Sequence, residues 1–175
     1  MKTLILIFSA ALLAGSLSKA DAKSTFVLRS NAFTNGATIP HEYAYDGYGC
    51  TGKNVSPELE WSGVPAGVKS FALTVFDPDA NKGKGWWHWV VYGIDPKTRS
   101  LAKGAQSPAL EGKTSFGKPG YGGPCPPPSD SPHHYVFTLY ALDESIGGKL
   151  DGPGLAEAVK GHMLAKAVLT GRFGR

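Results

Sequence analysis

Two apolar stretches separated by a short acidic turn dominate the hydrophobic pattern of the chain. Residues 71–76 and 87–92 have the length, the β-branched or aromatic content and the scarcity of polar residues that are typical of buried strands. Between them, Asp77-Pro78-Asp79 ends the first stretch, because proline donates no hydrogen bond to a neighbouring strand. The pattern predicts two buried strands joined through a polar connection.

Weaker patterns predict the remaining elements. Further strands are expected at residues 25–30, at the end of residues 54–61, at residues 135–142 and at residues 165–173. A short helix is expected after Asp151, which suits the N-cap position, with Pro153 in the first turn. Roughly seven or eight short strands with one or two helices indicate a mainly β chain, an antiparallel Greek-key β-sandwich with a short C-terminal helix.

Two segments have no clear period. Residues 97–118 are polar and glycine-rich, which predicts a long surface loop, and loops of that size are usually functional or mobile. Residues 117–131 are so rich in glycine and proline that a rigid, irregular shelf is expected there.

Composition and charge narrow the function classes. The chain is 42% apolar and contains 23 glycines and 13 prolines, which favours one ordered, turn-rich β domain over disorder. The net charge of +4 is spread over the chain without a run of Lys or Arg, so a nucleic-acid partner is not indicated.

The first residues have the pattern of a secretory signal peptide. A positive start is followed by apolar residues 4–13 and by Ala20-Asp21-Ala22, which matches the A-x-A cleavage pattern. A membrane anchor would need a longer apolar span. We therefore expect residues 1–22 to be a signal peptide removed near Ala22, and residues 23–175 to be one periplasmic or secreted domain.

Export changes the interpretation of the two cysteines. In an oxidising compartment, Cys50 and Cys125 most simply form one disulfide, which would join two glycine-rich turns. Neither cysteine has a second cysteine close to it in the sequence, so a cysteine metal site is not expected.

Polar residues at the edges of the apolar stretches are candidates for a site. Alternation in a strand places Trp87 and Trp89 on one face and His88 on the other. His88 is then either a hydrogen-bonded core histidine or the neighbour of Asp77 and Asp79 in a polar pocket.

A second polar cluster, His133-His134-Tyr135, precedes the strand at residues 135–142. Adjacent histidines point to opposite faces of a strand, so we expect His133, with Tyr135 on the same face, to share a pocket with His88. Protonated histidines there would favour an anion such as phosphate or carboxylate.

Three motifs in order, Asp77-Pro78-Asp79, Trp86-Trp87-His88-Trp89 and Gly123-Pro124-x-Pro126-Pro127 with His133-x-Tyr135, resemble the phosphatidylethanolamine-binding protein (PEBP) family. Within the family, the chain resembles the exported members of the bacterial, Raf-kinase-inhibitor-like branch. The resemblance implies a Greek-key β-sandwich with a small pocket for phosphate-like groups. It also implies the pocket residues Asp77, His88 and His133 with Tyr135 beside them, and a wall of Asp79, Trp86, Pro126 and Pro127.

The chain departs from the family pattern at three positions. Asn81 replaces a usual proline, His134 stands where many members have arginine, and Gly83 lies near the position of a pocket tyrosine in animal members. The cavity rim is therefore expected to differ.

The function expected from the resemblance is binding of a small anion or phospholipid headgroup, without a cofactor and without catalysis. One alternative is an inhibitor or scaffold that binds a partner protein, and the family likeness also implies a homodimer. Another alternative is a metal-assisted hydrolase that uses Asp77, Asp79, His88 and His133, although the sequence contains neither H-E-x-x-H nor G-x-S-x-G.

Overall fold

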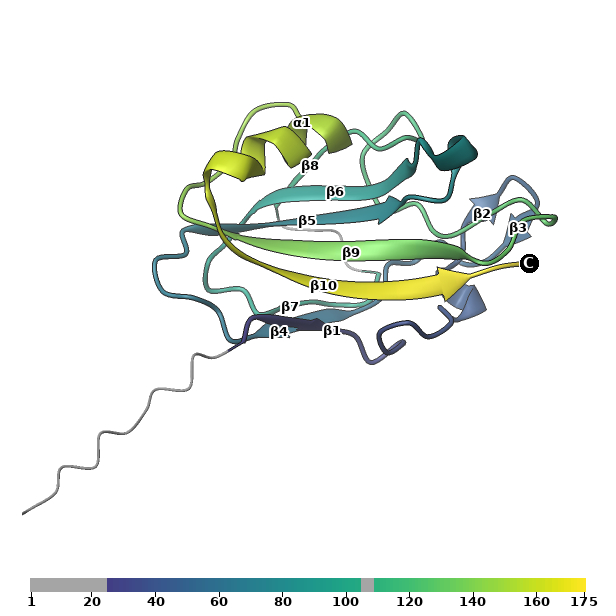
Figure 1. The fold of residues 1–175 in the computed structure, drawn as a ribbon, viewed down its shortest axis with the longest axis horizontal. Coiled ribbons are helices and arrows are strands. Elements are labelled where there is room, and N and C mark those ends of the chain that lie inside the picture. The colour runs from purple at the N-terminus through teal and green to yellow at the C-terminus, as the bar shows by residue number, and fades with distance from the viewer. Residues whose placement is uncertain (1–24, 105–108) are drawn as a thin grey trace, which may run out of the picture.

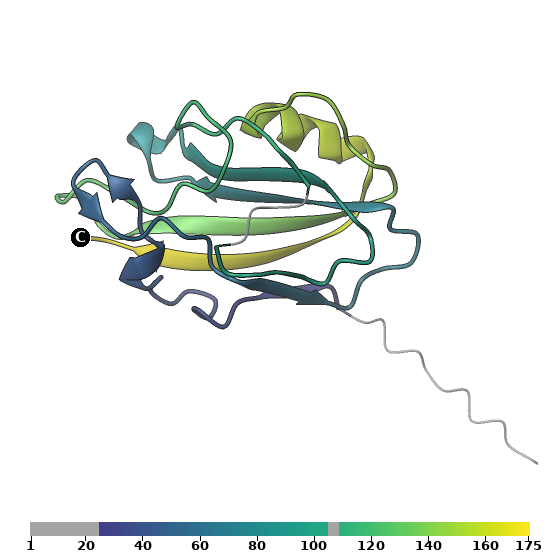
Figure 2. The same cartoon turned by 180° about the vertical axis from the view of Figure 1, so that it is seen from behind.

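The computed structural model describes residues 25–104 and 109–175. Figures 1 and 2 show a five-stranded sheet facing a three-stranded sheet, with one short helix on the outer side of the larger sheet. The strand orders are β10-β9-β5-β6-β8 and β1-β4-β7, and a small hairpin, β2-β3, lies apart. Paired strands within these sheets are antiparallel. The fold is thus the mainly β, antiparallel arrangement that the sequence predicts.

In the described part of the chain, the six strands longer than two residues have bounds close to those expected from the apolar stretches, whereas the four two-residue strands were not predicted. The strands are β1 Val27–Arg29, β2 Asp46–Gly47, β3 Cys50–Thr51, β4 Leu59–Ser62, β5 Ser70–Asp77, β6 Trp86–Ile94, β7 Ser100–Leu101, β8 Leu110–Glu111, β9 His133–Leu142 and β10 Met163–Phe173. The helix is α1 Gly152–Ala158, and 3₁₀ turns cover His41–Tyr43, Asn81–Gly83 and Val159–Gly161.

The main core lies between the two sheets. Strand β9 alternates between buried and half-exposed residues, because one of its faces meets this core. Strand β5 is buried along nearly its whole length, since it is central in the sheet and covered on both faces. Phe71, Leu73 and Phe137 are fully buried members of this core. The two central strands thereby fix the positions of the polar residues at their ends.

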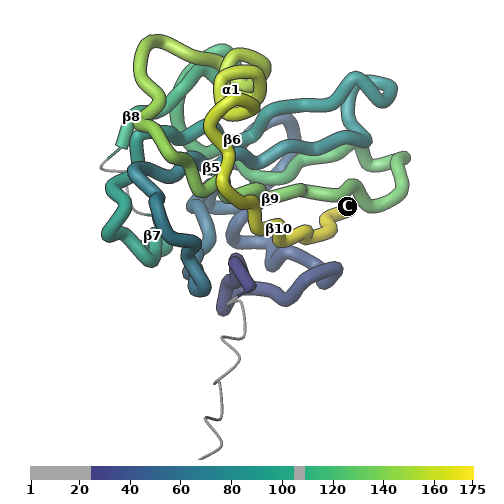
Figure 3. Tube along the Cα trace, turned by 60° about the vertical axis from the view of Figure 1, so that its left-hand side comes forward, coloured from purple at the N-terminus to yellow at the C-terminus, as the bar shows by residue number. Residues whose placement is uncertain are grey.

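Helix α1 lies over the outer face of the large sheet (Figure 3), and a smaller core fills the space between them. The side chain of Asp151 accepts a hydrogen bond from the backbone N–H of Gly154 at 2.9 Å, which confirms the predicted N-cap. Leu155 and Val159 pack against Val90 of β6 in this second core. The helix covers the sheet and lies away from the polar residues described below.

The predicted surface loop at residues 97–118 is partly wrong. Strand β7 in this segment pairs with β4, β8 pairs with β6, and Leu101 and Thr114 are buried. Two-residue strands have no detectable hydrophobic period, so their pairing depends on tertiary contacts that a sequence pattern does not contain. Residues 105–108 of this segment lie outside the described residues.

The predicted disulfide is present. Cys50 and Cys125 are bonded, with their Cα atoms 5.9 Å apart, and the bond joins the β2-β3 hairpin to the proline-rich segment before β9. The predicted signal peptide lies outside the described residues. Within the described ranges, no helix is long and apolar enough to span a membrane.

Candidate functional site

One end of the large sheet carries a cavity of about 590 Å³. Because neighbouring strands are antiparallel, the last residue of β5 and the first residues of β6 and β9 meet at this end. The cavity is lined by every residue that the sequence motifs singled out: Asp77, Asp79, Trp86, His88, Pro126, Pro127, His133 and Tyr135. Segments far apart in the sequence thus form one hollow.

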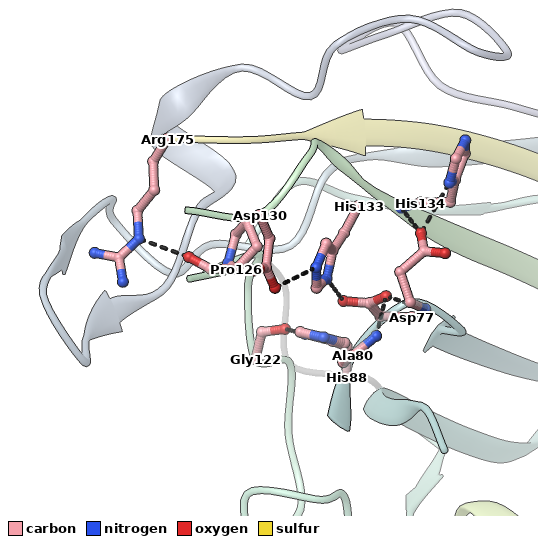
Figure 4. A network of polar contacts seen from close by, with 10 residues as sticks. Asp77, Ala80, His88, Gly122, Pro126, Asp130, His133, His134 and Arg175 are labelled. Atoms are coloured by element: carbon pink, nitrogen blue, oxygen red, sulfur yellow. Dashed lines mark hydrogen bonds and ion pairs between the residues drawn. The ribbon is translucent and has the colours of Figure 1, made fainter. Parts of the chain in front are cut away.

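Asp77 is the buried acceptor at the floor of this cavity. One carboxylate oxygen, Oδ1, accepts the backbone N–H groups of Asp79 at 2.9 Å and Ala80 at 3.2 Å (Figure 4). The other, Oδ2, accepts the Nδ1–H of His133 at 2.8 Å. The Asp77-Pro78-Asp79 turn therefore places a carboxylate whose two oxygens are both engaged by protein donors.

His133 lies between two carboxylates. Its Nδ1 faces Asp77, and its Nε2 lies 3.3 Å from Oδ2 of Asp130. Burial alone would lower the pKa of His133, but the hydrogen bonds to Asp77 and Asp130 and the charges of Asp77 and Asp79 outweigh burial and raise that pKa above its ordinary value. The imidazolium form, which has two N–H donors, is favoured at this position.

A β-bulge turns His88 into the cavity. Strand β6 contains one residue more than β5 between the pairs that flank this position, so the alternation of faces is broken. Trp87 packs on Phe76 and belongs to the outer core under α1, whereas Trp89 belongs to the core between the sheets. The prediction that the two tryptophans share a face is therefore wrong. His88 lies on the inner side, with its ring 5.1 Å from that of Tyr135.

The imidazole of His88 is neutral and has a fixed tautomer. Its Nδ1 donates to the carbonyl oxygen of Gly122 at 2.6 Å, since a carbonyl can only accept. Burial lowers the pKa of His88 to about 4, although the Gly122 carbonyl and the charge of Asp77 act in the opposite direction. At neutral pH, Nε2 is consequently an acceptor. Of the two histidines, only His133 has its pKa shifted toward the protonated form that would favour an anion.

Tyr135 contributes a buried hydroxyl. The residue is only 1% exposed, and its hydroxyl makes no hydrogen bond of good geometry with the described residues, although Asp77 and the backbone of Cys125 lie close enough to affect its pKa. Burial and the neighbouring charge of Asp77 raise the pKa of this hydroxyl, so it remains a donor. A buried polar group without a partner lowers stability, and such groups are rare in folded proteins.

His134 and Asp79 form a separate pair at the edge of the cavity. Asp79 Oδ2 accepts both the backbone N–H of His134 at 2.7 Å and its Nδ1–H at 2.8 Å. Burial opposes ionisation of Asp79, but the hydrogen bonds from His134 outweigh it and hold the pKa of this carboxyl below its usual range. His134 thus provides a donor to Asp79 at the position where many family members have arginine.

Eight residues of the cavity wall were not predicted as site residues: Tyr48, Ala80, Asn81, Lys82, Phe116, Pro128, Asp130 and Arg175. Phe116 lies in the segment expected to be a surface loop, and its ring stacks on Tyr45, 4.7 Å away, and meets Trp86 edge-on. An aromatic residue followed by glycine in a polar segment was the available sequence signal for Phe116.

Arg175 joins two parts of the cavity rim. Its guanidinium donates to the carbonyl oxygens of Pro126 at 2.6 Å, Gly49 at 2.9 Å and Tyr48 at 3.3 Å. These contacts link the β2-β3 hairpin to the proline-rich wall, as the disulfide does. No sequence pattern connects Arg175 to the predicted pocket residues, which lie forty or more positions earlier in the chain. Only the fold shows that Arg175 contributes to the cavity rim.

Comparison with known proteins agrees with this architecture. A family model described as phosphatidylethanolamine-binding protein matches residues 29–174. The chain belongs to the phosphatidylethanolamine-binding protein family. Over 150 residues it is 43% identical to the UPF0098 protein YbcL of Escherichia coli (strain K12), a match that covers 81% of this chain and 80% of that protein. The UPF0098 protein YbhB of the same organism is 41% identical over 156 residues, with 83% of this chain and 98% of YbhB covered.

Solved structures of family members have the same fold. The crystal structure of E. coli YbcL, described as a new member of the mammalian PEBP family, matches with a TM-score of 0.81 at 37% identity and covers 86% of this chain and 98% of that one. A putative PEBP homolog from Chlamydia trachomatis matches with a TM-score of 0.77 at 37% identity, covering 87% of this chain and 99% of the homolog.

Proposed function

We propose that this chain is an exported binding protein whose cavity takes a small phosphate-like anion, either free or as part of a phospholipid headgroup. The observation that carries the proposal is Tyr135, a residue of the cavity wall beside His88 whose buried hydroxyl makes no hydrogen bond of good geometry with the described residues. A ligand oxygen at this position would accept the hydroxyl proton and remove the cost of the unpaired donor.

Three carboxylates line the cavity, but its cations and hydrogen-bonding groups favour the same ligand. His133 carries a positive charge when protonated, and Lys82 and Arg175 add two more cations to the cavity wall. Nε2 of His88 is an acceptor and needs a donor from the ligand. A phosphate monoanion offers acceptor oxygens together with at least one P–OH group, so it can satisfy donors and an acceptor at once.

We propose binding rather than catalysis. Asp77 has both oxygens engaged by protein N–H groups, so it is poorly placed to act as a general base. Among the described residues, no three His, Cys, Asp or Glu side chains are arranged to hold a metal ion.

Calorimetric titration with inorganic phosphate and with phosphorylethanolamine, each at pH 6 and pH 8, tests this function. We expect tighter binding at pH 6, where His133 is protonated and the phosphate monoanion keeps its P–OH group. Tighter binding of phosphorylethanolamine than of phosphate would identify a headgroup as the ligand.

The variant His133→Ala should weaken binding by roughly tenfold or more, because it removes the charged donor. The matched control is His162→Ala, which removes an exposed histidine paired with Asp143 outside the cavity. Absence of binding at both pH values, or unchanged affinity in His133→Ala, contradicts the proposal.

Export is part of the proposal and has its own support. The Cys50–Cys125 bond suits an oxidising compartment. When the full-length chain is expressed in a Gram-negative host, we expect intact mass of the periplasmic fraction to correspond to residues 23–175. Recovery of the full-length chain in the cytoplasm, with both thiols free, would contradict export.

A further inference from the structure

Three carboxylates line the cavity, and their partners differ. Asp77 is buried with both oxygens engaged, and Asp79 is held by two N–H groups of His134. The side chain of Asp130 is 45% exposed, and among the described residues its recorded side-chain contact is the one to Nε2 of His133, at 3.3 Å. Asp130 is thus the carboxylate that is least firmly held.

Asp130 is carried by a turn in the cavity wall. Its backbone N–H donates to the carbonyl of Pro127 at 3.1 Å, which fixes the main chain of the residue independently of its side chain. Figure 4 shows the Asp130 carboxylate facing the imidazole of His133 from the side opposite Asp77. Its side chain can therefore leave His133 without unfolding the turn.

The imidazolium of His133 has two N–H donors. Nδ1–H is committed to the buried carboxylate of Asp77 at 2.8 Å, so Nε2–H is the donor left for a ligand. The Asp130 carboxylate already lies at that donor. An anion that bonds to His133 must take the place of Asp130.

We propose that Asp130 is an internal competitor for the anion, a residue that limits affinity by occupying the Nε2–H of His133 until a ligand displaces it. This inference rests on the proposed function, because it concerns the same cavity and the same class of ligand. Asp130 carries the same sign of charge as the ligand and uses the same donor. Its long, half-exposed contact is weak enough to be exchanged, whereas the short, buried contact of Asp77 is not.

The test compares the affinity for inorganic phosphate of wild type, Asp130→Asn and Asp130→Ala by calorimetry at pH 6 in a phosphate-free buffer. Asn keeps the shape of the side chain and removes its charge, and Ala removes the competing oxygens altogether. Both variants should bind phosphate roughly fivefold tighter or more, because they free Nε2–H and remove a like charge.

The matched control is Asp143→Asn. Asp143 also pairs with a histidine, His162, at 3.1 Å, and its side chain is 50% exposed outside the cavity. This substitution changes the net charge by the same amount, so the phosphate affinity of the control should stay within about twofold of wild type.

The outcomes separate the two proposals. If wild type binds phosphate and both Asp130 variants bind it equally or less tightly, the competitor role is wrong and the proposed function stands. An equal gain in Asp143→Asn overturns it too, since the effect would then be one of general charge. Binding confined to the Asp130 variants supports the competitor role, and absence of phosphate binding in every protein removes both proposals.

Discussion

The Oδ2 oxygen of Asp77 accepts the Nδ1–H of His133 at 2.8 Å, and this bond joins the end of β5 to the start of β9 inside the protein. Both side chains are almost completely buried, at 3% and 6% exposure. The pair therefore holds together two of the strand ends that form the cavity, and it fixes which nitrogen of His133 faces the interior.

Asp77→Asn should lower the free energy of unfolding by about 3 kcal/mol, because breaking a buried pair leaves its partner without compensation. It should also lower the pKa of His133, which the Asp77 carboxylate raises. Urea unfolding at pH 7 measures the first effect, and an NMR titration of the His133 ring measures the second. Asp143→Asn, at an exposed pair, should change neither, and an Asp77 variant as stable as wild type with an unshifted His133 would show that the pair does not hold the strand ends.

His88 predicts a specific loss of stability in acid. Burial lowers its folded-state pKa from 6.5 to about 4, so the unfolded chain binds more protons than the folded protein in this range. Titration of His88 therefore accounts for about 3 kcal/mol of the free energy of unfolding. This amount is fully present above about pH 6.5 and is lost as the pH falls through 4.

His88→Gln should remove this part of the acid dependence. The pKa of His133 is raised in the folded protein, so its contribution to the free energy of unfolding is lost as the pH rises. Wild type and His88→Gln both contain His133, so this contribution cancels when their unfolding free energies are compared. Unfolding free energies measured in urea from pH 7 to pH 4 should fall less steeply for His88→Gln than for wild type. Parallel curves would mean that His88 titrates normally in the folded protein.

The disulfide predicts a large stability difference on reduction. It joins cysteines 75 residues apart, and the chain-entropy argument gives about 4 kcal/mol for a loop of that length. The double variant Cys50→Ser with Cys125→Ser should lose about that amount in urea unfolding, and the wild type should lose it when reduced. Identical unfolding midpoints with and without reductant would show that the bond does not form in the purified protein.

The strands that carry the site could be predicted because their side chains meet a core. Strands β5, β6 and β9 are apolar runs, and Asp77 and His133 are polar residues at their ends, so the antiparallel pairing brings both to one edge. The bulge at His88 could not be predicted, since it depends on how β6 is matched to β5 rather than on the composition of either strand.

The rest of the cavity wall depends on tertiary contacts. Phe116 belongs to a segment without a hydrophobic period, and Arg175 reaches the cavity through backbone carbonyls of a distant hairpin. Asp130 lies in the glycine- and proline-rich segment at residues 117–131, and only the fold shows that it contacts His133. These residues carry no spacing signal, because nothing local in the sequence determines where they lie.

The most direct test of the account is phosphate titration of Tyr135→Phe at pH 6, with Tyr140→Phe, a half-buried residue on the helix side of the sheet, as the control. The account predicts a loss of affinity of roughly tenfold for Tyr135→Phe, with a free energy of unfolding within about 1 kcal/mol of wild type, because the hydroxyl is unpaired before the ligand binds. The control should bind phosphate as wild type does. Undiminished phosphate affinity in a folded Tyr135→Phe variant would contradict the proposed binding site.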